Sequence, residues 1–269
     1  MRPELASLGA RLARELGEAL YPPLCWLCRR SRAIDGLGCA EHALAGAEFD
    51  PAEPRCAGCL ERLPRAVSTG PCASCRREGR GYRRLHAVGP YRPGRALAEW
   101  ILAFKHGRRV DLARPLGRLL ARALPERAEG SVLVPVPLHP LKRIERGHDQ
   151  ARLLADAVHL AAGLAVATGL ARIRWTAPQG DPAAPSRGAN VAGAFALVRG
   201  ARAKLAGRRV LLVDDVVTSG ATVGACAELL RAGGVLEVSV LALARAERRD
   251  DGDDADADRL RAAEALEPT

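Results

Sequence analysis

The sequence has no uninterrupted apolar run long enough to span a membrane. Its first twenty residues mix charged residues throughout and lack the apolar core of a signal peptide. Leucines recur there at helical spacing, which predicts an amphipathic docking helix, with a helix lying on a membrane surface as the less favoured alternative. We therefore expect a cytoplasmic protein.

Two nucleotide-binding motifs are also missing. No G-x-x-x-x-G-K-[ST] loop occurs in the chain, which argues against a nucleoside-triphosphatase, although VLLVDD at 210–215 resembles the acidic strand of that class. The glycine-rich first strand–helix junction of a Rossmann dinucleotide site is absent as well. A phosphate-bearing ligand must therefore be held by a different kind of loop.

Lysine and aromatic residues are both scarce. Three of the 41 basic residues are lysines, and aromatic residues make up 3% of the chain. The net charge is +10, but residues 250–269 carry −6, which leaves +16 on residues 1–249. A region with this much positive charge attracts polyanions, although a solvated arginine-rich surface explains the charge equally well. If the chain binds nucleic acid, the scarcity of aromatic side chains favours contact with the backbone over base stacking. The aromatic residues available for stacking are Trp26, Tyr82, Tyr91 and Trp175.

The cysteines, by contrast, are concentrated in one segment. Seven of the eight lie between residues 25 and 75, where six form three C-x-x-C pairs and Cys39 has His42 at the same step. A two-residue gap lets a tight turn aim both side chains at one ion, so four such pairs match two structural zinc sites. The candidate ligands are Cys25, Cys28, Cys39, His42, Cys56, Cys59, Cys72 and Cys75.

Disulfides are the alternative to zinc. They require an oxidising compartment, would leave a seventh cysteine unpaired and would give His42 no role, so zinc is favoured. Sequential pairing gives one three-cysteine, one-histidine site and one all-cysteine site, while a cross-braced pairing of the same ligands stays open. Since the protein would fill every coordination position, neither zinc is expected to be catalytic. Cys226, alone in a helical pattern, is interpreted as a buried apolar residue.

Beyond the cysteines, predicted strands alternate with predicted helices. This alternation indicates an α/β fold with a parallel sheet and right-handed crossovers. The strands are expected within 81–91, 131–140, 191–198, 208–215 and 236–246, and the helices within 95–107, 110–124, 146–163 and 220–234. We expect an N-terminal helix with a double zinc-knuckle module over 1–80, an α/β domain over 81–249 and a disordered acidic tail over 250–269.

The segment 208–224, RRVLLVDDVVTSGATVG, is the most informative. Ligands of an open parallel sheet sit beyond the carboxyl ends of its strands. Gly220 permits close backbone approach, and hydroxyls and helix N–H groups around it are donors for a phosphate. Asp214 and Asp215 fit beside a phosphate only if they face ribose hydroxyls or a divalent cation. These features predict a ligand with a ribose, a 5′-phosphate and a magnesium-chelating group.

Val210 to Thr222 closely resembles the phosphoribosyl pyrophosphate (PRPP) fingerprint of type I phosphoribosyltransferases: four apolar residues, two acids, two apolar residues and T-x-G-x-T. A wider resemblance, over about residues 22–246, is to ComF-family competence proteins. It rests on the zinc knuckles, VPVPLHP…RGHDQA, the set Thr176, Gln179, Arg187 and Asn190 ahead of GAF, and VLLVDDVVTSGAT. The chain departs from the family at His42, at His148-Asp149 and at Val217 and Ser219 around Thr218.

The resemblance implies a type I phosphoribosyltransferase-like sheet flanked by helices, preceded by a zinc-binding module. It implies that Asp214 and Asp215 hold ribose hydroxyls and order magnesium, and that the ribose and 5′-phosphate contact Val216, Val217, Thr218, Ser219, Gly220, Ala221 and Thr222. It assigns the pyrophosphate loop and a mobile lid to Pro137, Leu138, His139, Lys142, Arg143 and Arg146. Further candidates are Lys105, Gln150, Gln179, Arg187 and Asn190.

Each assignment has a plainer alternative: solvated acids at a strand end, a proline-terminated strand, a solvated charge run, or a helix cap for Lys105. Two functions follow from the resemblance. One is a DNA-uptake protein that handles single-stranded DNA during natural transformation and binds PRPP. The other is a magnesium-dependent phosphoribosyltransferase with an unidentified nitrogenous acceptor, releasing pyrophosphate. The implied partners are PRPP, single-stranded DNA and other DNA-uptake proteins such as a helicase.

Overall fold

The computed structural model describes residues 24–34, 37–44, 47–64, 67, 70–107, 109–174 and 193–247. They fall in two compact units, Met1–Gly46 and Ala47–Thr269. The predicted N-terminal helix, the segment with Gln179, Arg187 and Asn190, and the acidic tail lie outside the described residues. Among the described helices, none is both long and apolar enough to cross a membrane.

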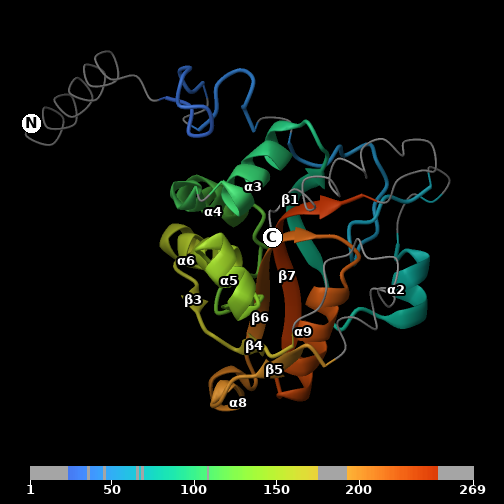
Figure 1. Cartoon of the computed structure of the whole chain (residues 1–269). Helices are drawn as coiled ribbons and strands as arrows, with labels where there is room; N and C mark the ends of the chain where they lie inside the picture. Colours follow the sequence, from blue (N-terminus) through green and yellow to red (C-terminus); the bar gives the residue numbers. More distant parts are fainter. Residues whose placement is uncertain are drawn as a thin grey trace, which may run out of the picture. The chain divides into compact units, whose positions relative to one another are not determined.

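A five-stranded parallel sheet forms the centre of the second unit (Figure 1). The strands are apolar runs because helices cover both faces; Leu212, Val213 and Leu241, for example, are all 0% exposed. The predicted α/β fold with a helix-flanked parallel sheet is confirmed. The strand order is β1 (Leu85–Tyr91), β7 (Glu237–Ala246), β6 (Arg209–Val217), β2 (Val132–Pro135) and β3 (Ala165–Val166).

Alternate side chains of the central strands enter different layers of the core. Val210 and Leu212 of β6 share a buried cluster with Val223 and Leu230 of α9 (Ala221–Ala232). The helices on the other side of the sheet in Figure 1 are α3 (Ala96–His106), α4 (Ala113–Arg122) and α6 (Gln150–Ala162). The remaining elements are α2 (Ala73–Glu78), η1 (Val110–Leu112), α5 (Pro140–Arg146), α8 (Ala201–Leu205) and the antiparallel pair β4 (Leu170–Arg172) and β5 (Phe195–Leu197).

The segment with Lys142, Arg143 and Arg146, predicted to be a mobile lid, forms the short helix α5 (Pro140–Arg146). The prediction was wrong because it gave the charge run more weight than the signals at its ends. His139 caps the helix, since its Nδ1 accepts from the Leu141 N–H at 3.3 Å, and Pro140 suits the first turn. Gly147 ends the helix in the left-handed conformation, with φ +75°.

Candidate phosphoribosyl site

The candidate site begins in the last residues of β6. The strand extends to Val217, two residues further than the sequence predicts, so the acidic pair lies inside the strand and not at its end. Asp214 pairs in register with Ala242 of β7, and its Oδ1 accepts the Asp215 N–H at 2.9 Å. Asp215 Oδ1 in turn accepts the Val216 N–H at 2.6 Å. The two carboxylates are therefore oriented by their own backbone.

The surroundings of Asp214 favour its protonated form. Burial raises the pKa of this carboxyl well above its usual value, and the neighbouring Asp215 raises it further. The charge of Lys105, at the end of α3, acts in the opposite direction and lowers the pKa of Asp214. Ionising two adjacent carboxylates in a buried position costs free energy, unless a cation or hydroxyl donors bind to them.

The loop after β6 turns sharply into α9. Gly220 has φ +82° at the start of the helix, a conformation that side chains rarely adopt. The Ala221 N–H donates to Ser219 Oγ at 3.3 Å, and Thr218 is exposed. The first turn of a helix leaves backbone N–H groups without intrahelical acceptors, and its positive end attracts anions. We call residues 218–222 the phosphate loop.

Arg80 and Tyr82 lie against this loop, and sequence reasoning missed both roles. A Cβ atom at Gly220 would come within 2.7 Å of Arg80 Nη1 and 3.3 Å of Tyr82 Oη. Arg80 Nη1 donates to the Ser219 carbonyl at 2.6 Å, and its Nε donates to Cys75 Sγ at 3.3 Å. One guanidinium thus joins the phosphate loop to a cysteine of the candidate metal ligands.

Arg245 makes a second connection. This arginine is 3% exposed, lies in β7 opposite Val217 and forms an ion pair with Glu61. Its guanidinium donates to the carbonyl of Cys59 at 3.0 Å, to that of Val217 at 3.3 Å and to that of Thr218. A charge within the otherwise apolar run LALARA was the sequence signal for this role.

The eight candidate metal ligands form two clusters. We call Cys25, Cys28, Cys39 and His42 the first cluster, and Cys56, Cys59, Cys72 and Cys75 the second cluster. Within each cluster the ligand atoms lie within 4.8 Å of one another. The structure thus groups the ligands sequentially and not crosswise, and the described cysteines are free thiols. Both sets have the donors and spacing of a closed tetrahedral metal site, so the two clusters can each hold a metal ion.

The proposed pyrophosphate residues follow β2, which pairs with β6 up to Pro135 opposite Val213. The segment from Pro137 to His139 is half-buried there. Arg146, at the end of α5, has a buried Nε with no hydrogen-bond partner among the described residues. Such a buried donor is expected to have an acceptor, and an anion would supply one. Of the other α5 candidates, Lys142 is half-buried and Arg143 is exposed.

The residues after α5 connect it to the end of α3. His148 is 8% exposed and its Nε2 lies 2.9 Å from the Phe104 carbonyl. Gln150 is 3% exposed and donates to the Lys105 carbonyl at 3.3 Å. Gln150 therefore holds the backbone at the end of α3, where Lys105 supplies the positive charge that acts on Asp214. The candidates Gln179, Arg187 and Asn190 lie outside the described residues.

The ring platforms considered from the sequence are largely unavailable. Tyr82 and Tyr91 are each 8% exposed, so neither offers a ring face to a base. Trp26 is 37% exposed, and Trp175 lies outside the described residues. Both tyrosines belong to the buried interior, so neither is available as a stacking platform.

Comparison with known proteins places this geometry in a family. Residues 154–267 match the family model of the phosphoribosyl transferase domain, so the predicted phosphoribosyltransferase-like fold is confirmed. The chain is 34% identical to DNA utilization protein YhgH of Salmonella typhimurium over 232 residues, which cover 83% of this chain and 97% of that protein. Competence protein F of Haemophilus influenzae is 29% identical over 209 residues, covering 71% of this chain and 90% of that protein.

Among solved structures, the allosteric regulatory enzyme of purine biosynthesis is 24% identical, with a TM-score of 0.35, over 50% of this chain and 26% of that chain. The near-complete coverage of YhgH at 34% identity is the stronger finding. The chain therefore belongs to the ComF family, the family of DNA utilization protein YhgH and competence protein F.

Proposed function

We propose that the chain binds PRPP, or a closely related phosphoribosyl ligand, at the carboxyl end of β6. One observation carries the proposal: the acidic pair, the left-handed Gly220 and the start of α9 follow one another without interruption. Amide groups of the phosphate loop are suited to the 5′-phosphate, and the carboxylates are suited to the ribose hydroxyls. Lys105 and the buried Nε of Arg146 supply positive charge for the pyrophosphate.

We propose magnesium and zinc as the cofactors. Asp214 and Asp215 would hold magnesium together with the ligand, and the metal would neutralise charge on pyrophosphate. The raised pKa of Asp214 supports this role, because a bound cation offsets the cost of ionising the pair. Zinc fits both clusters, since thiolates and imidazole are its usual ligands in closed sites.

We propose further that the chain handles single-stranded DNA during DNA uptake, in the cytoplasm. The names of its relatives, DNA utilization protein and competence protein, support this role. So does the net charge of +16 on residues 1–249, which favours contact with a phosphate backbone. Because the buried tyrosines offer no ring, we expect backbone contact and little base preference.

Isothermal titration with PRPP and magnesium, repeated with a single-stranded oligonucleotide present, tests both parts. We expect saturable PRPP binding that requires magnesium and is abolished in the Asp214→Asn, Asp215→Asn double variant. We expect oligonucleotide affinity that falls steeply with salt, as counterion release demands. Magnesium-dependent PRPP binding that the double variant retains would contradict the site, and salt-independent oligonucleotide binding would contradict the DNA role.

A second candidate function is transfer of the phosphoribosyl group. The ribose C1–oxygen bond to pyrophosphate would break and a bond from C1 to an acceptor nitrogen would form, with pyrophosphate leaving. The cationic groups around the candidate pyrophosphate position, Lys105 and Arg146, favour this function because negative charge develops on the leaving group. Pyrophosphate release from PRPP across a panel of nitrogenous acceptors is the test, and its absence from the whole panel would leave binding as the function.

A further inference from the structure

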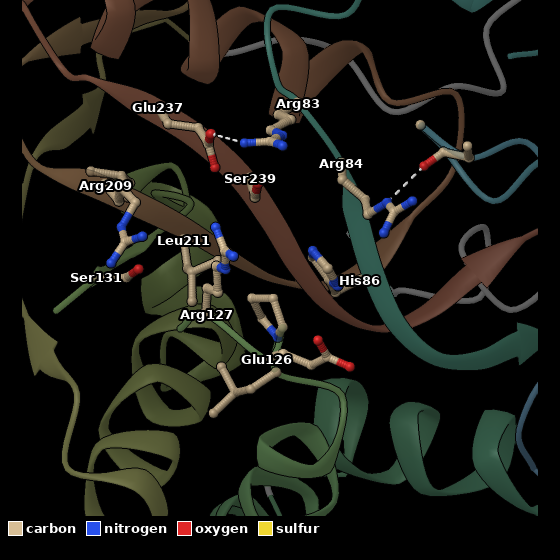
Figure 2. A pocket seen from close by; sticks show the side chains of 15 residues that line it. Arg83, Arg84, His86, Glu126, Arg127, Ser131, Arg209, Leu211, Glu237 and Ser239 are labelled. Atoms are coloured by element: carbon tan, nitrogen blue, oxygen red, sulfur yellow. Dashed lines mark hydrogen bonds and ion pairs between the residues drawn. The ribbon is translucent and has the colours of Figure 1, made fainter. Parts of the chain in front are cut away.

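A polar cavity lies at the opposite end of the sheet from the phosphate loop. Its volume is about 810 Å³, within the usual size range of small-molecule sites. Its walls come from the amino ends of β1, β2, β6 and β7, whereas the phosphate loop follows the carboxyl end of β6. Since β6 has nine residues, the two places are roughly 25 Å apart. We call this cavity the basic pocket (Figure 2).

The sequence explains why positive charge gathers there. Arginines directly precede or begin the strands: Arg83 and Arg84 stand before β1, and Arg209 is the first residue of β6. In a parallel sheet the amino ends of neighbouring strands meet at one edge, so these side chains converge. Figure 2 shows them around one space together with Arg127 and His86. Four arginines and two glutamates line the pocket, which gives it a net positive charge.

The arginines differ in how far their charge is already used. Arg83 pairs with Glu237, while Arg84 donates from Nε to the Ala57 carbonyl at 3.0 Å. Arg209 donates from one terminal nitrogen to the Glu129 carbonyl at 2.7 Å. Arg127 has no hydrogen bond or ion pair among the described residues, and it is exposed. Arg127 and the remaining N–H groups of Arg84 and Arg209 are therefore available to an anion.

Two serine hydroxyls complete the polar lining. Ser131 is 5% exposed and Ser239 is 7% exposed, and both line the pocket. Within the described part of the chain, neither hydroxyl has a hydrogen-bond partner. Both hydroxyls remain accessible from the pocket and can donate to a ligand oxygen. Burial and the charge of Arg84 also lower the pKa of His86, which is consistent with a positive field in the pocket.

The lining is not polar alone. Leu124 and Pro125, both half-buried, add apolar surface beside the arginines. A small inorganic anion would leave this surface and most of the volume unused. A ligand with both a phosphate and a flat ring would use the cations, the hydroxyls and the apolar wall, with the planar groups of Arg84 and His86 as stacking partners.

We propose that the basic pocket binds a 5′-nucleotide, whose phosphate contacts Arg127, Arg209 and the serine hydroxyls and whose base lies against the apolar wall. The same chemistry is offered by a free mononucleotide and by the 5′-phosphorylated end of a DNA strand. The site is separate from the phosphate loop, so the proposal does not depend on PRPP binding.

Fluorescence anisotropy with a labelled dAMP, and with a labelled oligonucleotide carrying either a 5′-phosphate or a 5′-hydroxyl, tests the proposal on the full chain. Arg127→Gln combined with Arg209→Gln is expected to weaken the phosphorylated probes about tenfold or more, since two charge-assisted contacts are lost. Arg118→Gln, an exposed arginine of α4 outside the pocket, is the matched control and should change affinity less than twofold. Inorganic phosphate should compete only weakly.

Preferential binding of dAMP would identify the free nucleotide as the ligand, and preferential binding of the 5′-phosphorylated strand over the 5′-hydroxyl strand would identify a strand end. Either result supports the proposal if the double arginine variant loses this binding and the Asp214→Asn, Asp215→Asn variant retains it. Loss in the aspartate variant with retention in the arginine variant would place the nucleotide in the phosphate loop and overturn the proposal. Failure of every probe, or equal affinity for inorganic phosphate, would also overturn it.

Discussion

The two cysteine clusters offer a metal nearly the same donors but differ in what they are connected to. In the first cluster, side-chain contacts join ligands of the same segment, such as Cys39 Sγ to His42 Nδ1 at 3.1 Å. The second cluster is joined to the phosphate loop twice, through Arg80 and through Arg245. A metal in the first cluster would therefore order its own segment, and a metal in the second cluster would also help to position residues 218–222.

The second connection is costly to break because it is buried. Arg245 is 3% exposed, and its guanidinium is satisfied by Glu61 and by backbone carbonyls on both sides. Removing one partner of a buried ion pair typically costs about 3–5 kcal/mol, since the other charge is left uncompensated. The phosphate loop is therefore expected to lose its conformation when the second cluster does.

The largest expected effect comes from Cys59→Ser in the second cluster. Loss of a metal ligand removes the metal and its contribution to folding, and the displaced Cys59 carbonyl no longer holds Arg245. We expect a drop in Tm of about 10 °C or more and a loss of PRPP affinity of tenfold or more. Calorimetry and titration measure both, and metal analysis should show one ion fewer. Unchanged PRPP affinity in a folded, metal-depleted variant would contradict the claim that the second cluster, unlike the first, positions the phosphate loop.

The next effect is expected from Gly220→Ala. The new Cβ would meet Arg80 Nη1 at 2.7 Å, in a conformation with φ +82°. The left-handed conformation alone costs about 1–2 kcal/mol for an alanine. We expect PRPP affinity to fall about tenfold while both metals stay bound. Gly94→Ala, also at positive φ but with nothing within 4 Å of the new Cβ, controls for backbone strain alone.

Arg80→Gln tests the connection between the second cluster and the phosphate loop without replacing a metal ligand. The change removes the charged donor that joins Cys75 Sγ to the Ser219 carbonyl. We expect PRPP affinity to fall about five- to tenfold with the metal content unchanged, because the lost charge-assisted hydrogen bond, about 1.5–3 kcal/mol, holds the loop and not the ligand, so only part of it reaches the affinity. Arg77→Gln, on the exposed side of α2, is the control and should bind PRPP like the unmodified chain. Equal affinities of the two variants would show that Arg80 does not transmit the effect.

A smaller effect, of a few degrees, is expected from Asp214→Asn. Folding raises the pKa of Asp214, so the folded chain holds this proton more tightly than the unfolded chain. The stability from this group is complete below the usual pKa of 3.8 and is lost as the pH rises through the raised value. Without added magnesium, the Tm of the variant should exceed that of the unmodified chain by more at pH 8 than at pH 5. A Tm difference that becomes smaller as the pH rises would contradict the raised pKa of Asp214.

The smallest effect on the ligand site is expected from Cys39→Ser in the first cluster. This cluster belongs to the compact unit Met1–Gly46, whereas residues 218–222 belong to the unit Ala47–Thr269. We expect loss of one metal ion and less than a twofold change in PRPP affinity, by metal analysis and titration. A tenfold loss would show that the two clusters have the same role after all.

Local patterns predicted the sheet and the phosphate loop, because alternation of apolar runs and a thirteen-residue motif are properties of neighbouring residues. Arg80 and Arg245 were missed since each acts on groups far away in the chain. Arg80 and Ser219 are 139 residues apart, and Arg245 and Cys59 are 186 apart. Only the packing of the second cluster against the sheet brings these groups together, and no spacing in the sequence reports it.

The basic pocket had a sequence signal that went unused. Arginines before β1 and at the start of β6 counted only toward the net charge, although parallel strands bring such positions to one edge. The helix α5 was missed for a related reason: a run of charges resembles a loop, whereas its end signals, His139 and Gly147, are each a single residue.

Hydrogen–deuterium exchange of the phosphate-loop amides, measured without any ligand in Cys59→Ser and in Cys39→Ser, tests the link between metal and loop most directly. If the second cluster holds residues 218–222 through Arg80 and Arg245, exchange there should accelerate strongly in Cys59→Ser and stay as in the unmodified chain in Cys39→Ser. Equal exchange in the two variants, whether fast or slow, would contradict the account.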